Sequence, residues 1–197
     1  MKNFKLHILI SFKACTLVAA FFCNHEAQGL PAISEHSMTS NMFYCEIGKN
    51  FPVNKTAQNF GASLNFSRNC GFRHPLNDKW IMGISLGFKT LRRKGSNGQL
   101  DILMLTHEAH RVFRIQHPLY LSIAAKAQYL APTASQRIPT ERDPDYETEV
   151  GAGLSATFWY KASSKWIINF RWDRWRGTKT TQLQGYETAF GASYLVP

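Results

Sequence analysis

The stretch Trp80-Ile-Met-Gly-Ile-Ser-Leu-Gly-Phe-Lys89 alternates large apolar side chains with small or polar ones. Successive side chains of a β-strand point to opposite faces of the sheet, so this period of two predicts a strand. One face would carry the large residues Trp80, Met82, Ile84, Leu86 and Phe88. The opposite face would carry glycine, serine and a single lysine, and it is therefore unusually small.

The same alternation recurs along the chain. We expect clear strands over 60–67, 80–89, 119–129, 149–160, 166–173 and 186–196, with weaker ones over 43–49 and 100–106. The connections after odd-numbered strands are long and polar, above all residues 131–146, whereas residues 161–165 form a short turn after the sixth strand. Such a meander of eight strands predicts a single domain, an all-β, closed antiparallel up-and-down eight-stranded β-barrel.

The N-terminal residues have the order of a secretory signal peptide. Three lysines without an acid precede an apolar run over 14–23 and a small-residue pattern ending at Gly29. The run is ten residues long, well short of the roughly 18 that a spanning helix needs. We therefore assign 1–29 to a signal peptide and 30–197 to the barrel, which keeps 20 basic and 12 acidic residues, a net charge of +8. Cys45 and Cys70 remain, and an even pair in an exported protein favours a disulfide.

The composition of the two faces favours a membrane barrel over a soluble carrier resembling lipocalins. The apolar faces are rich in Phe, Trp, Leu and Ile over about ten residues, the length of a tilted strand that crosses hydrocarbon. The small faces suit the narrow interior of eight strands. They also carry isolated charges of both signs, which would form a network in the lumen because an unpaired buried charge is costly: Lys89, Lys126, Glu149, Arg171, Asp173 and Glu187.

On these patterns the chain resembles the small outer-membrane β-barrels of Gram-negative bacteria, the class of OmpA, OmpX and OmpW. The ending Gly191-Ala-Ser-Tyr194-Leu-Val196 is similar to the C-terminal signal that the barrel-assembly machinery reads in that class, although Pro197 replaces the final aromatic residue. The resemblance implies an outer-membrane location with both termini in the periplasm and the long loops outside. It also places Cys45 and Cys70 near the periplasmic ends of neighbouring strands.

Basic residues of the outward loops are candidates for binding the phosphates of lipopolysaccharide. They are Arg92, Arg93, Lys94, Arg174, Arg176 and Lys179, with Lys49 and Lys55 in the first loop. The loop over 131–146 is a candidate surface for another partner. An exported barrel is a poor candidate for binding nucleic acid.

Catalytic signals are weak. The cluster Thr106-His107-Glu108-Ala109-His110 lacks the spacing of a zinc motif, and we expect neither a metal site nor a cofactor. Since a longer fourth strand would point charged residues into lipid, we end that strand near Thr106 and place 107–117 in a long periplasmic connection. The leading hypothesis is a non-enzymatic outer-membrane barrel that serves envelope integrity or surface interaction. An enzyme that modifies lipid A and a soluble carrier remain as alternatives.

Overall fold

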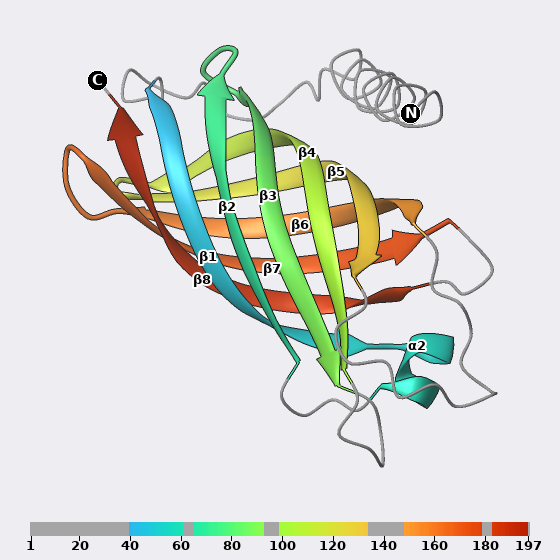
Figure 1. Ribbon diagram of the computed structural model, residues 1–197. Helices are drawn as coiled ribbons and strands as arrows, with labels where there is room; N and C mark the ends of the chain where they lie inside the picture. The colour runs from blue at the N-terminus through green and yellow to red at the C-terminus, as the bar shows by residue number, and fades with distance from the viewer. Residues whose placement is uncertain (1–39, 61–64, 93–98, 134–147, 179–182, 197) are drawn as a thin grey trace.

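In a computed structural model, residues 40–60, 65–92, 99–133, 148–178 and 183–196 are described. Eight antiparallel strands pair in chain order and the last pairs with the first, which closes a barrel (Figure 1). The strands are β1 (Asn41–Pro52), β2 (Phe66–Pro75), β3 (Trp80–Arg92), β4 (Gln99–Gln116), β5 (Leu119–Thr133), β6 (Glu149–Lys161), β7 (Trp166–Gly177) and β8 (Gln184–Val196). The predicted architecture is thus confirmed.

Two predicted strands were placed wrongly. The second strand runs over Phe66–Pro75 and not over 60–67, because its partner β3 begins at Trp80 and the tight turn between them fixes the register. The fourth strand does not end near Thr106 but continues to Gln116, so the expected long connection over 107–117 does not exist. Only His117 and Pro118 separate β4 from β5. At the other end, β5 takes in the first three residues of the loop expected over 131–146, whose remaining residues up to 146 lie outside the described part of the chain.

The register fixes the shape of the barrel. From Met42 the paired residues lead from strand to strand around the barrel and back to β1 at Pro52, ten residues further along. With about 3.3 Å per residue and about 4.8 Å between strands, this shift corresponds to a strand tilt of about 41° and a radius of about 8 Å. The lumen is therefore wide enough for side chains and for little else.

The two ends of the barrel differ. At the terminal end, where β1 begins and β8 finishes, the turns are short and held by side chains: Asn77 Oδ1 accepts hydrogen bonds from the amides of Lys79 and Trp80. At the opposite end, the connection after β1 holds the helix α2 (Asn54–Asn59). Thr56 Oγ1 accepts a hydrogen bond from the amide of Gln184 at 3.0 Å, which fastens α2 to the start of β8. We call this the α2 end.

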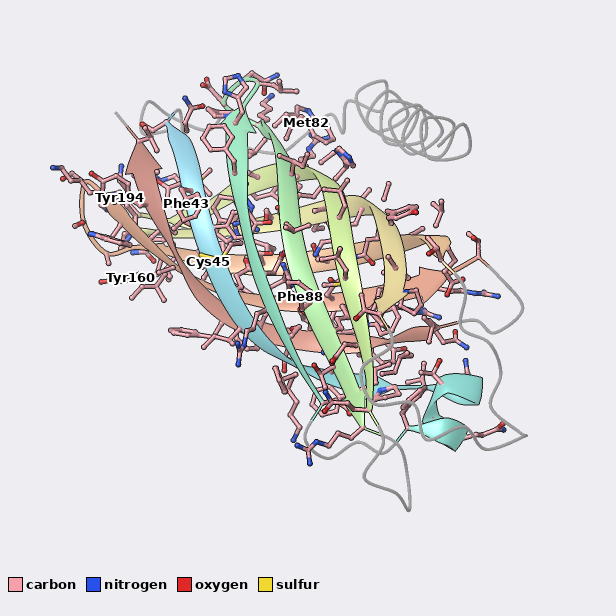
Figure 2. The ribbon with its side chains drawn as sticks, viewed as in Figure 1. Phe43, Cys45, Met82, Phe88, Tyr160 and Tyr194 are labelled. Atoms are coloured by element: carbon pink, nitrogen blue, oxygen red, sulfur yellow. A yellow bond between two sulfur atoms is a disulfide. The ribbon has the colours of Figure 1, made fainter. Side chains whose placement is uncertain are left out.

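None of the helices in the described residues is long and apolar enough to cross a membrane. The outer wall of the barrel is apolar, as the alternation predicted. Ile47, Leu86, Phe158 and Phe190 are each more than half exposed there. Figure 2 shows Phe43, Tyr160 and Tyr194 on the outside of the barrel, near the end at which β8 finishes.

Candidate functional site: the lumen and the outer wall

The charges predicted for the interior all lie in the lumen, and all are buried. Lys126 Nζ lies 2.9 Å from Asp173 Oδ2, and Lys89 Nζ lies 2.8 Å from Glu187 Oε2. Arg171 Nη2 donates to Glu187 Oε1 at 2.6 Å. Glu149 lies apart from this group, beside Gly177 at the α2 end, where the glycine leaves room for its carboxylate. Ion pairs thus join β3 and β7 to β8, and β5 to β7.

The lumen also holds charged residues that the sequence analysis missed. Arg73 is its centre: Nε donates to Glu108 Oε1 at 2.7 Å and Nη2 to Glu46 Oε1 at 3.2 Å. Glu46 is also paired with Arg171 and accepts a hydrogen bond from Asn169 Nδ2 at 2.8 Å. Glu46 therefore links the two groups of charges into one network. Its inward position could have been found from the alternation over 43–49, whereas Arg73 and Glu108 fell outside the predicted strands.

Glycines and aromatic rings make room for these long side chains. A Cβ atom on Gly83 would lie 2.7 Å from Glu108 Cγ, and one on Gly191 would lie 2.6 Å from Glu46 Cγ. The guanidinium of Arg73 lies 3.5 Å from the centre of the Tyr44 ring, and Lys89 Nζ lies 4.0 Å from that of Trp175. Because cations are attracted to the faces of aromatic rings, these contacts stabilise the buried charges in addition to their ion pairs.

Apolar clusters fill the lumen on both sides of the network. The cluster at the terminal end consists of Met42, Ile81, Val112, Tyr120, Trp159, Ile167 and Leu195. The cluster at the α2 end consists of Phe60, Leu91, Ile102, Met104, Leu130, Trp175 and Leu183. Trp159 and Trp175 are each only 1% exposed. In the described residues, side chains therefore fill the lumen, with the charge network in the middle and an apolar cluster towards each end, beside which Glu149 lies at the α2 end.

Ser122, His110 and Glu108 form a chain of contacts that resembles a hydrolytic triad in composition. His110 Nδ1 lies 3.2 Å from Ser122 Oγ, and His110 Nε2 lies 3.0 Å from Glu108 Oε1. All three residues are fully buried, and Glu108 also accepts hydrogen bonds from Tyr44 and Arg73. A nucleophile must reach a position beside its substrate, whereas Ser122 is 0% exposed. The geometry is that of an internal polar network.

We expected a longer fourth strand to point charged residues into lipid, but β4 continues to Gln116. Glu108 and His110 face inward, and His107 and Arg111 face the outer wall, where both are partly buried. The Arg111 guanidinium lies 5.8 Å from the centre of the Trp80 ring near the terminal end. Within the described residues, no group of three His, Cys, Asp or Glu side chains could hold a metal ion.

Cys45 and Cys70 are direct cross-strand partners and are joined in a disulfide on the outer wall. Their Cα atoms are 4.1 Å apart, and both residues are exposed. The disulfide links β1 to β2 and closes the segment that contains α2.

The basic residues expected at the rim lie in different parts of the structure. Arg92, Arg174 and Arg176 are exposed and lie in the α2-end portions of β3 and β7. Arg93, Lys94 and Lys179 lie outside the described residues, as do the signal-peptide residues 1–29. Lys49 belongs to the exposed outer face of β1 and not to a loop. Lys55 lies in α2, and the other described basic residues of this set lie on the strands themselves.

Comparisons with solved structures find barrels of the same kind. Neisserial surface protein A matches with a TM-score of 0.56 and 12% identity over 79% of this chain and 96% of that chain. The N-terminal β-barrel domain of Pseudomonas aeruginosa OprF matches with a TM-score of 0.52 and 10% identity, again over 79% of this chain and 96% of that chain. No family model and no curated protein sequence matches. The chain therefore has the fold of the small eight-stranded outer-membrane β-barrels.

Proposed function

We propose that this protein is a non-enzymatic barrel of a Gram-negative outer membrane, which serves envelope integrity or surface interaction. The observation that carries the proposal is the filled lumen, with a balanced charge network between two apolar clusters. A pore needs a water-filled path, whereas large side chains occupy this interior. The apolar outer wall supports a lipid environment, since it is the face that a soluble carrier would turn inward.

The α2 end faces the cell exterior in this proposal, and both termini face the periplasm. The barrel-assembly machinery inserts the chain after its signal peptide is removed. The longer connections at the α2 end, including the loop up to residue 146, would then be available to partners. The basic rim formed by Arg92, Arg174 and Arg176 would contact the phosphates of lipopolysaccharide, since guanidinium groups bind phosphate oxygens in pairs of hydrogen bonds.

Cell fractionation tests the location. We expect the protein in the outer-membrane fraction, extractable only with detergent and migrating differently on a gel before and after boiling. Recovery as a soluble periplasmic protein would overturn the proposal in favour of a carrier. In planar bilayers the purified barrel should show no stable conductance, and a regular open channel would contradict the filled lumen.

A labelling experiment tests the orientation. Gln58→Cys places a thiol on α2 and Ser164→Cys places one in the short turn between β6 and β7, both at exposed positions. A membrane-impermeant maleimide should label the first variant and not the second in intact cells, and both should react after lysis. The reverse pattern would refute the orientation.

The alternative, an enzyme that modifies lipid A, is tested with the purified barrel. Ser122 lies beside His110 and would be the nucleophile of such an enzyme, so the variant to compare with the wild type is Ser122→Ala. We expect lipid A incubated with either the wild type or this variant to keep all its acyl chains by mass spectrometry. Loss or gain of an acyl chain with the wild type would establish an enzyme.

A further inference from the structure

Three exposed cations face outward on adjacent strands in the α2-end half of the wall. They are Lys49 on β1, Arg68 on β2 and Arg174 on β7, with β8 between β7 and β1. Each lies against an aromatic ring: Phe51, Phe66 and Tyr186, at 5.5, 5.3 and 5.8 Å from the ring centre. We call these six residues the basic-aromatic patch.

The register puts the three cations at one level. At the tilt derived above, each residue along a strand rises about 2.5 Å along the barrel axis and each strand crossed adds about 3.2 Å. On this scale Lys49, Arg68 and Arg174 lie about 20, 18 and 19 Å above Asn41. At one level the strands, which tilt by about 41°, are about 6.4 Å apart around the wall, so the three spacings of the patch span about 19 Å.

The rings show which way the cations extend. Phe51 and Phe66 each lie two residues closer to the α2 end than Lys49 and Arg68 on the same strands. Tyr186 is the cross-strand partner of Arg174, and on the same scale it lies about 3 Å closer to that end. The long side chains therefore run along apolar wall and hold their charges towards the α2-end edge of the apolar band, as cationic residues do near a membrane interface.

Among the described strand residues, no acid faces outward on the four strands of the patch. The acids of its four strands, Glu46, Asp173 and Glu187, all point into the lumen. At the same level the remaining strands present uncharged residues outward, namely Phe88, Leu105, Ala127 and Ala152. A general solvated rim would distribute its cations around the barrel, whereas these gather over β7, β8, β1 and β2.

The apolar wall continues directly towards the terminal end from the patch. Ile47, paired with Arg68 on one side and with Phe190 on the other, is 66% exposed, and Phe190 is 59% exposed. A ligand for this surface has anionic groups at the level of the cations and hydrocarbon chains below them. Because about 19 Å around the wall separates the outer cations, a lipid with two phosphates matches the patch better than one with a single phosphate.

We propose that the basic-aromatic patch binds one diphosphorylated glycolipid, lipid A of the outer leaflet, from the lipid side of the wall. This rests on the proposed outer-membrane location with the α2 end outward. The phosphates contact Lys49, Arg68 and Arg174, and the acyl chains lie over Ile47 and Phe190.

Binding to the purified, detergent-solubilised full barrel tests the site. The probes are diphosphorylated lipid A, monophosphorylated lipid A and phosphatidylglycerol, measured by native mass spectrometry. The variants are Lys49→Gln, Arg68→Gln and Arg174→Gln, alone and together. The matched control is Arg111→Gln, an outward cation that also lies over a ring but near the terminal end. Heat-modifiable gel migration checks that every variant is folded.

We expect each single variant to weaken binding of diphosphorylated lipid A about fivefold, and the triple variant about 100-fold, with Arg111→Gln unchanged. Monophosphorylated lipid A and phosphatidylglycerol should bind at least tenfold more weakly to the wild type. Equal binding of the three lipids, or equal loss in Arg111→Gln, overturns the site. If the protein were found in a fraction other than the outer membrane, the proposed function would be refuted. The lipid-binding measurement in detergent does not depend on that location, so the two proposals can fail separately.

Discussion

Removing the disulfide on the outer wall gives a stability change that can be calculated from the chain. Cys45 and Cys70 are 25 residues apart, and the bond between them restricts the unfolded chain by closing that loop. For a loop of this length the chain-entropy relation gives about 3.5 kcal/mol at 25 °C. Both cysteines are exposed on the outer wall, so replacing them with alanine leaves no cavity in the lumen. The loss should therefore come almost entirely from the unfolded state.

The assay is reversible urea unfolding in detergent micelles, followed by tryptophan fluorescence. With a slope of about 2 kcal/mol per molar urea, Cys45→Ala/Cys70→Ala should lower the midpoint by about 1.8 M. Each single variant and the wild type under reducing conditions should show the same shift, because each lacks the same bond. A double variant within about 0.5 kcal/mol of the oxidised wild type would refute the reasoning, as would single variants whose effects add.

Three further perturbations test the lumen by the same unfolding assay. Arg73→Met should cost about 3–5 kcal/mol by leaving buried carboxylates without their partner, and adding Glu108→Gln should recover part of the loss; additive effects would show that the two residues are not coupled. Gly83→Val should cost about 1–3 kcal/mol because its side chain would collide with Glu108, whereas Ala152→Val on the outer face should change stability by less than about 0.5 kcal/mol. Trp159→Ala should cost about 3–5 kcal/mol by leaving a cavity in the cluster at the terminal end, and a loss below about 1 kcal/mol would mean that this cluster is not packed.

The sequence predicted the architecture because most strands obey the alternation along their whole length. In β7 the outward residues Trp166, Ile168, Phe170 and Trp172 alternate with inward ones, and the structure keeps this order. The long and short connections also fall at opposite ends of the barrel, as predicted. In this fold, which residues share a face follows from the period of two alone.

The error in the fourth strand has its physical cause in the clusters at the ends of the lumen. In β4 the inward residues include Ile102 and Met104 near the α2 end and Val112 near the terminal end, with Glu108 and His110 between them. Both faces are apolar near the strand ends, so the alternation fades there. Charge in the middle of this stretch predicts a connection, whereas in β4 it marks the charged centre of the lumen. The partners of these charges lie on other strands and cannot be identified from local patterns.

The level of the basic-aromatic patch could not be predicted from the sequence for a related reason. Lys49, Arg68 and Arg174 are far apart in the chain and come together only through the tilt and the ten-residue shift of the closed barrel. Arg68 also lay outside the predicted second strand. The basic rim could be proposed from composition, but the grouping of these cations on one side required the register.

The ion pairs of the lumen also bear on how the barrel enters a bilayer. Adjacent strands carry opposite charges that contact each other: Glu46 with Arg73 across β1 and β2, and Arg171 with Glu187 across β7 and β8. Each of these hairpins contains one ion pair that can form before the barrel is complete, whereas Asp173 of β7 finds its partner Lys126 only when β5 is in place. The contacts of Lys89 with Glu187 and of Glu46 with Arg171 join strands from opposite ends of the chain and form only on closure. In a barrel that pairs its strands in chain order, the ion pairs within hairpins would form first, and the pairs that join early strands to late ones would form on closure.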